Sequence, residues 1–158
     1  MEAPKILIVD DEEEVRSSIM RKMQWEQLGY QLVGDAENGE DALEKVRVLE
    51  PDLVLTDIKM PYMDGLTLCK NLKQSYRNMK VIIYSGFDDF EFAREAVHLE
   101  AEEYLLKPIS AGDMEAAFSK VRKKLDQAVH PAGNSTYDKG ITAFCYDTYF
   151  HLFFAPFS

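Results

Sequence analysis

Four short apolar segments of this 158-residue sequence end in side chains that can take part in phosphoryl-transfer chemistry. The segments are KILIVDD, LVLTD, KVIIYS and EYLLK, and the side chains at their ends are Asp10, Asp11, Asp57, Ser85 and Lys107. Clustered carboxylates repel one another, whereas a bound divalent cation holds them together, and oxygen ligands favour Mg²⁺. If these segments meet in the fold, the sequence predicts a magnesium site in which one carboxylate attacks phosphorus and forms an acyl phosphate.

The other groups in this set would stabilise the transferred phosphoryl group. Mg²⁺ and Lys107 would neutralise charge on its oxygens, and Ser85 could donate a hydrogen bond to one of them. The sequence has no glycine-rich phosphate loop of the Walker or dinucleotide type, so a tightly bound nucleotide is not expected. The prediction is therefore chemistry on a small anion.

Each of these residues also has a purely structural interpretation when it is taken alone. Asp10 or Asp11 could cap a helix, and Asp57 could be a turn residue. Ser85 could be a turn or capping hydroxyl, and Lys107 could be a solvated charge. The functional interpretation is favoured because all of them fall at the carboxyl ends of strands in one predicted sheet.

Apolar runs and helical periodicity alternate along the chain. Strands are predicted at 5–9, 30–36, 52–56, 80–85 and 103–107. Apolar residues at helical spacing predict a helix after each strand, the first of which is expected to stop at Gly29. This alternation predicts an α/β fold, a doubly wound, flavodoxin-like, five-stranded parallel sheet in the order 2-1-3-4-5 with helices on both faces. Ligands in such sheets bind beyond the carboxyl ends of the strands, here between strands 1 and 3.

Composition narrows the class of protein and of partner. The net charge is −10 and the pI is near 4.8, so the surface repels phosphates and direct nucleic-acid binding by this chain is not expected. No apolar run reaches the ~20 residues of a membrane span, and no signal peptide is readable at the start. Cys69 and Cys145 fit neither a disulfide framework nor a zinc motif. A cytoplasmic protein with no membrane partner is predicted.

The four segments also carry a resemblance to a known family. ILIVDDE, LVLTDIKMPYMDG, VIIYSGFDD and EYLLKP resemble the receiver domain of bacterial two-component response regulators, over roughly residues 4–126. The resemblance implies that a sensor histidine kinase is the partner and that an aspartate is phosphorylated with Mg²⁺. It further implies a cis peptide bond between Lys107 and Pro108.

The resemblance assigns a role to each matching position. Asp57 matches the phosphoacceptor, the pair Asp10 and Asp11 matches the acids that hold Mg²⁺, and the main-chain carbonyl of Lys59 matches a further metal ligand. The switch residues are matched by Ser85 and Tyr104, and the invariant lysine by Lys107. Lys59 and Phe87, each two residues beyond a site residue, are expected to flank the approach of hydrolytic water and so to tune the lifetime of the phosphoryl group.

A finer resemblance links the chain to receivers that are joined to AraC-type helix-turn-helix output domains in Gram-positive bacteria. The segments SGFDDFEFAREAVHLEAEEYLLKPIS and WEQLGYQLVGDAENGEDAL carry it. We expect a receiver over residues 1–126 and a linker and aromatic-rich tail over residues 127–158, with no complete output domain. Alternate residues of TAFCYDTYFHLFF are apolar, which fits either a docking strand or an extension without a fixed place in the fold.

The predicted function is that of a phosphorylation-activated response regulator that controls transcription through an output domain absent from this chain. A single-domain phosphorelay intermediate and an aspartyl-phosphate phosphatase are the alternatives. Such phosphatases usually carry Asp-x-Asp after the first strand, whereas this chain has adjacent aspartates and is not expected to be an enzyme.

Phosphorylation is expected to draw Ser85 inward and to move Tyr104 from an exposed to a buried position. The face altered would comprise the helix after the fourth strand, the fifth strand and the last helix. Charged residues of both signs are expected there, which could support a phosphorylation-strengthened homodimer: Glu95, Glu102, Glu103, Asp113, Arg94, Lys120, Lys123 and Lys124.

Overall fold

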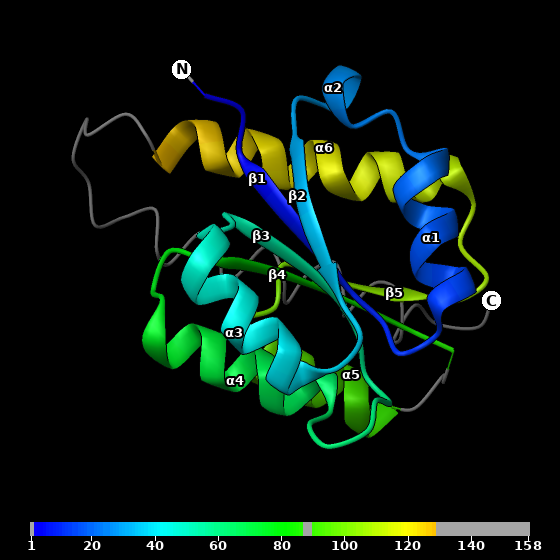
Figure 1. Ribbon diagram of the computed structural model, residues 1–158, viewed down its shortest axis with the longest axis vertical. Coiled ribbons are helices and arrows are strands. Elements are labelled where there is room, and N and C mark those ends of the chain that lie inside the picture. The colour runs from blue at the N-terminus through cyan, green and yellow to red at the C-terminus, as the bar shows by residue number, and fades with distance from the viewer. Residues whose placement is uncertain (1, 87–89, 129–158) are drawn as a thin grey trace, which may run out of the picture.

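The computed structural model describes residues 2–86 and 90–128 of the chain (Figure 1). Strands and helices alternate through this part of the chain, as predicted. The strands are β1 (Lys5–Val9), β2 (Gln31–Ala36), β3 (Leu53–Asp57), β4 (Lys80–Ser85) and β5 (Glu103–Leu106). The helices are α1 (Glu13–Lys22), α2 (Trp25–Leu28), α3 (Gly39–Leu49), α4 (Gly65–Ser75), α5 (Phe90–His98) and α6 (Ala111–Ala128).

The strands form one parallel sheet in the order β2-β1-β3-β4-β5, which confirms the predicted topology. The chain enters the sheet at β1, moves outward to β2, and then returns past β1 to β3. This reversal leaves the carboxyl ends of β1 and β3 side by side, where open α/β sheets bind ligands. All five residues of β3 are buried, including the polar Thr56 and Asp57 that follow the apolar run at its start.

The helices cover both faces of the sheet and divide the core into two clusters (Figure 1). One cluster packs strand residues such as Val54 and Ile83 against α3, α4 and α5. The other packs residues such as Leu55 and Ile82 against α1, α2 and α6. Neighbouring residues of a strand belong to opposite clusters because side chains alternate between the two faces of a sheet.

The prediction of a single helix between the first strand and Gly29 is wrong in one respect. The structure has two helices there, α1 and α2. Met23 has extended backbone angles (φ −85°, ψ 135°) and ends α1, while its N–H still donates to the carbonyl of Ile19. The break allows Trp25 to be buried and to donate its indole N–H to the Met20 carbonyl at 3.1 Å. Gly29 then ends α2 with a left-handed φ of 82°, as a glycine at this position does readily.

A buried ion-pair network lies at the end of the sheet opposite the predicted site and links the sheet to helices α4 and α6. The Glu102 side chain is 3% exposed, and its carboxylate lies 2.8 Å from Lys124, 3.5 Å from Lys80 and 4.0 Å from Lys73. Burial alone would raise the pKa of Glu102, but these ammonium groups outweigh it and hold the pKa below its ordinary value. Glu102 was expected on an exposed face, and that expectation is wrong because these lysines draw its carboxylate inward.

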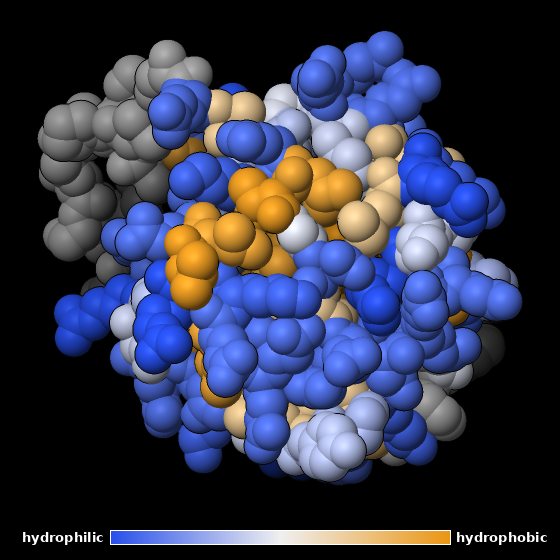
Figure 2. Space-filling view, viewed as in Figure 1, coloured by the Kyte–Doolittle hydropathy of each residue, from blue (hydrophilic) through white to orange (hydrophobic). Residues whose placement is uncertain are grey.

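The visible surface is mainly polar, with one apolar area. Figure 2 shows apolar side chains gathered beside the edge strand β2 and the end of α3, where Val48 is 74% exposed. Among the described residues, no helix is both long enough and apolar enough to cross a membrane.

Candidate functional site at the carboxyl ends of the strands

Asp57 is the last residue of β3 and is only 6% exposed. Its Oδ1 accepts the Ile58 N–H at 2.7 Å, and its Oδ2 lies 3.2 Å from the Lys107 ammonium. The turn after Ile58 folds back so tightly that the Gly65 N–H donates to the Ile58 carbonyl at 2.7 Å. A Cβ at Gly65 would lie 1.9 Å from the Asp57 carbonyl oxygen, so only glycine fits there.

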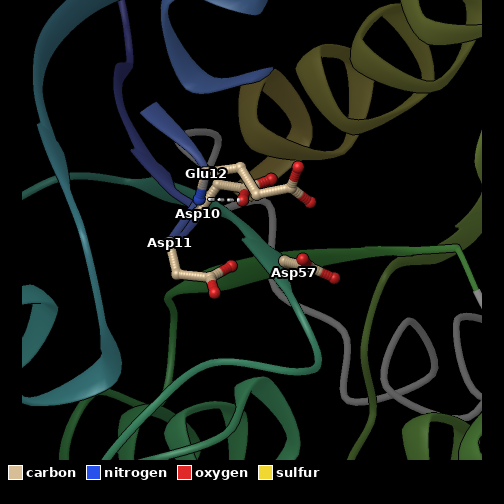
Figure 3. Close-up of side chains that lie close together, drawn as sticks. All are labelled: Asp10, Asp11, Glu12 and Asp57. Carbon is tan, nitrogen blue, oxygen red and sulfur yellow. Dashed lines mark hydrogen bonds between the residues drawn. The ribbon is translucent and has the colours of Figure 1, made fainter. Parts of the chain in front are cut away.

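Acidic side chains from the end of β1 converge on Asp57 (Figure 3). Asp10, Asp11, Glu12 and Asp57 each offer a carboxylate oxygen, and these oxygens all lie within 4.8 Å of one another. Asp10 is fully buried, and its Oδ1 accepts the Glu12 N–H at 2.8 Å, whereas Asp11 and Glu12 are exposed. The site therefore combines two buried carboxylates with two that face solvent.

Lys107 supplies the positive charge of the site. Its Nζ lies 3.2 Å from Asp10 Oδ2 and 3.2 Å from Asp57 Oδ2, and it therefore bridges the ends of β1 and β3. The same nitrogen lies 4.5 Å from the centre of the Tyr84 ring, and the Tyr84 hydroxyl donates to Asp10 Oδ2. The peptide bond from Lys107 to Pro108 is cis, as the resemblance implied.

Burial and neighbouring charges set the electrostatics of this site. Burial raises the pKa of Asp57 above its ordinary value, and the Asp10 charge adds to this, although Lys107 opposes both. Burial would lower the pKa of Lys107, but the attraction of Asp10 and then Asp57 outweighs it and raises the pKa. Lys107 is therefore charged at neutral pH. Its single positive charge does not fully offset the burial of Asp57 and the repulsion from Asp10, so the pKa of Asp57 remains raised.

The donor set fits Mg²⁺. Hard oxygen ligands are those that Mg²⁺ prefers, and a divalent cation would relieve the repulsion that raises the pKa of Asp57. Sequence reasoning did not include Glu12 among the acidic residues of the site. Its carboxylate nevertheless belongs to the same cluster.

The remaining predicted residues occupy different parts of the site. Ser85 is fully buried at the end of β4, and its carbonyl accepts the Lys107 N–H at 2.8 Å. Tyr104 is 6% exposed and belongs to the core cluster against α3, α4 and α5. Lys59, two residues after Asp57 in the sequence, is exposed. Phe87 lies outside the described residues.

Sequence reasoning missed Tyr84 and Arg16. Tyr84 pairs with Asp57 across the β3–β4 ladder, and strand alternation places both on the face that α1 and α6 cover. Counting this alternation along KVIIYS would have found Tyr84. Arg16 donates to the Asp10 carbonyl and to the Asp35 carboxylate, each at 2.6 Å, and thereby holds α1 to the ends of β1 and β2. No local signal marks that contact.

Comparisons with known proteins agree with this geometry. The family model of the response regulator receiver domain matches residues 6–119. The uncharacterised transcriptional regulatory protein YesN of Bacillus subtilis is 39% identical over 127 residues, which cover 80% of this chain and 34% of YesN. The transcriptional regulatory protein HptR of Staphylococcus aureus is 32% identical, with 78% of this chain and 48% of HptR covered.

Solved structures show the same fold. The receiver domain of AraT, a response regulator from Geobacillus stearothermophilus, superposes with a TM-score of 0.76 at 37% identity and covers 81% of this chain and 99% of that domain. CheY of Borrelia burgdorferi, in its complex with CheX, BeF₃ and magnesium, gives a TM-score of 0.65 at 25% identity, with 74% of this chain and 87% of that one covered.

The chain matches only a third to a half of the length of the curated relatives named above. Because the family model covers most of the chain and the fold agrees with it, the chain belongs to the response regulator receiver domain family.

Proposed function

We propose that this chain accepts a phosphoryl group from a sensor histidine kinase on Asp57 and changes conformation in response. The observation that carries the proposal is the position of the Asp57 carboxylate, which lies at the end of β3, within the acidic cluster and 3.2 Å from the Lys107 ammonium. A histidine kinase is the general partner of receiver domains.

In the proposed reaction, an oxygen of the ionised Asp57 carboxylate forms a bond to phosphorus as the bond from phosphorus to the donor nitrogen breaks. The electron pair of the broken bond stays on the imidazole of the kinase. Lys107 leaves its present position between two carboxylates and pairs with a phosphoryl oxygen. Asp11, Asp57 and the Lys59 carbonyl, with Asp10 behind them, would hold Mg²⁺, which neutralises charge on the phosphoryl group when it is bound.

The same proposal includes a switch at Ser85 and Tyr104. Strand alternation places both residues on the face covered by α3, α4 and α5, and Tyr104 pairs with Ile83 across the ladder. A phosphoryl oxygen near Ser85 would offer its hydroxyl a charge-assisted hydrogen bond. The buried position of Tyr104 corresponds to the inward state of this switch, so phosphorylation would increase the population of this Tyr104 position.

Relatives of the chain are transcriptional regulators, and we propose the same role for the protein that contains this receiver. Residues 1–126 would be the receiver and residues 127–158 a linker and tail, which lie almost wholly outside the described part. Receivers are not a family of catalytic enzymes, which sets aside the phosphatase alternative. A single-domain phosphorelay intermediate stays the second candidate, since its site would be the same.

The proposed homodimer would use the face formed by α5, β5 and α6. Glu102 cannot contribute to it because that carboxylate is buried among lysines, and Glu103 already lies 3.5 Å from Lys120. Exposed charges of both signs still occur there, including Arg94, Glu95 and Lys123. A second copy of the chain, turned by a two-fold axis, could pair these charges.

The phosphoryl acceptor is tested by substitution. Incubation of the full chain with Mg²⁺ and acetyl phosphate should add one hydroxylamine-labile phosphate, measured by intact mass spectrometry. Asp57→Asn should add none, because an amide is not a nucleophile. Asp52→Asn, which changes an exposed aspartate just before β3, should label like the wild type. Normal labelling of Asp57→Asn would disprove the assignment.

A further inference from the structure

Tyr84 enters the candidate site from β4 as a buried side chain. Its exposed fraction is 1%, and its hydroxyl donates to Asp10 Oδ2. The face of its ring lies 4.5 Å from the Lys107 ammonium, within the range of a cation–π contact. The Tyr84 side chain thus contacts both the fully buried Asp10 and the Lys107 ammonium, which lies between Asp10 and Asp57.

The hydrogen bonds that Asp10 accepts show what the Tyr84 hydroxyl contributes to holding its carboxylate. Oδ1 accepts the Glu12 N–H, while Oδ2 accepts from the Tyr84 hydroxyl and from Lys107. Asp10 is fully buried, so water from bulk solvent cannot replace a lost donor at its present position. When Lys107 moves to a phosphoryl oxygen, Oδ2 loses one of its two donors. The Tyr84 hydroxyl is the donor that remains.

We propose that Tyr84 is a positioning residue for phosphoryl transfer. Its hydroxyl fixes the Asp10 carboxylate in the orientation needed at the metal site, and its ring guides the Lys107 ammonium. It also lowers the cost of releasing Lys107 toward the phosphoryl group, because Asp10 is not left as a buried charge with only one donor. This inference rests on the proposed function of the site.

A simpler interpretation is that the Tyr84 hydroxyl is merely satisfied by the nearest acceptor. Tyr30 provides the matched comparison. It is also 1% exposed, lies in the same core cluster, and donates its hydroxyl to a buried acceptor, the Phe118 carbonyl, at 2.7 Å. Tyr30 does not belong to the acidic cluster. A purely structural role for Tyr84 therefore predicts the same outcome for Tyr84→Phe and Tyr30→Phe.

The test is Mg²⁺ binding by the full chain, measured by isothermal titration calorimetry for the wild type, Tyr84→Phe and Tyr30→Phe. Loss of an outer hydrogen-bond partner typically weakens metal binding by 10–100-fold, so we expect about a tenfold loss for Tyr84→Phe. Tyr30→Phe should bind Mg²⁺ like the wild type even though it loses a buried hydrogen bond. An unchanged or tighter Mg²⁺ affinity in Tyr84→Phe, or an equal loss in both variants, would overturn the inference.

A measurement on the unchanged protein covers the case in which Tyr84→Phe does not fold. In a wild-type chain with ¹³C at the phenolic carbon of tyrosine, the Tyr84 signal should shift during a Mg²⁺ titration while the Tyr30 signal stays in place. A wild-type chain that bound Mg²⁺ without any shift of Tyr84 would also overturn the inference. A wild-type chain that neither bound Mg²⁺ nor accepted phosphate would instead overturn the proposed function.

Discussion

At the scale of single residues, burying the negative charges of the site costs free energy in the folded state. Asp57 and Asp10 are buried close together, and Lys107 is shared between them at 3.2 Å from each. Burial and the Asp10 charge together raise the pKa of Asp57. The free energy that keeps Asp57 ionised must come from the rest of the fold, and a bound cation or phosphoryl group would reduce that cost.

This electrostatic cost predicts that Asp57→Asn stabilises the protein near neutral pH when Mg²⁺ is removed with a chelator. The folded state holds the Asp57 proton to a higher pH than the unfolded state, whose pKa is near the ordinary 3.8. Wild-type stability should therefore fall as pH rises from that value through the raised folded pKa, whereas the asparagine variant avoids this loss. Thermal unfolding at several pH values measures the difference.

The expected result at pH 7 is a melting temperature a few degrees higher for Asp57→Asn than for the wild type. Below the ordinary aspartate pKa the two proteins should melt together, because Asp57 is protonated in both states. Asp52→Asn, at an exposed position, serves as the control. A wild type that is more stable than Asp57→Asn at pH 7 without Mg²⁺ would contradict the raised pKa.

At the scale of elements, tight turns at the carboxyl ends of the strands hold these residues. The loop between β3 and α4 returns to the end of β3, where the Gly65 N–H bonds to the Ile58 carbonyl, and α4 then begins with Asp64 accepting the Thr67 N–H at 2.7 Å. The capping bond fixes the first turn of the helix. The short loop and the cap together set the position of Asp57.

Substitution of Gly65 by alanine tests this positioning. The added Cβ would meet the Asp57 carbonyl oxygen at 1.9 Å and its carbon at 2.8 Å, both of them backbone atoms that cannot rotate away. We expect Gly65→Ala to lower the free energy of unfolding by about 1–3 kcal/mol, measured by urea denaturation. It should also weaken Mg²⁺ binding, because the end of β3 must move.

Gly86→Ala is the matched control for that experiment. It directly follows the neighbouring strand β4, and among the described residues no atom beyond the glycine and its chain neighbours lies within 4 Å of the position that a Cβ would take. Its effect on the free energy of unfolding should be within about 0.5 kcal/mol. Equal losses for the two glycines would show that the close approach at Gly65 does not position Asp57.

At the scale of the whole molecule, the site and the predicted dimer face lie on connected elements. Lys107 follows β5 directly, and β5 joins α5 to α6 in the sequence. Glu102 at the start of β5 is held by Lys73 of α4, Lys80 of β4 and Lys124 of α6. A change at the proposed phosphorylation site can therefore reach α6 through a strand that is anchored at its other end.

The dimer is tested by sedimentation with and without beryllofluoride and Mg²⁺. The average mass of the wild-type chain should rise when the phosphoryl mimic is bound, in the high-micromolar range or above. Lys123→Glu, on the exposed face of α6, should weaken this association, whereas Lys70→Glu on α4 should not. The same set repeated with residues 1–128 separates the receiver from the rest of the chain. A monomer in both conditions at these concentrations would exclude this dimer.

Much of the architecture was predictable because the signals for it are local. The apolar run KVIIYS predicted β4 with its observed bounds, and the helical spacing of Met114, Ala117 and Val121 predicted α6. Strand order followed from the alternation of strands and helices together with the handedness of their connections. The break at Met23 was not predictable in this way, since it depends on the burial of Trp25 against Phe118, whose ring lies 5.2 Å away in α6.

The sequence by itself determined which residues end the strands, and therefore that Asp10, Asp57 and Lys107 would meet at one edge of the sheet. Only the tertiary structure decided which side chains complete the site and which are withdrawn from the surface. Tyr84 reaches Asp10, and Glu102 is buried among three lysines. Residue type and local spacing carry no information on such contacts, because they depend on the register of neighbouring strands and on helices that pack from distant parts of the chain.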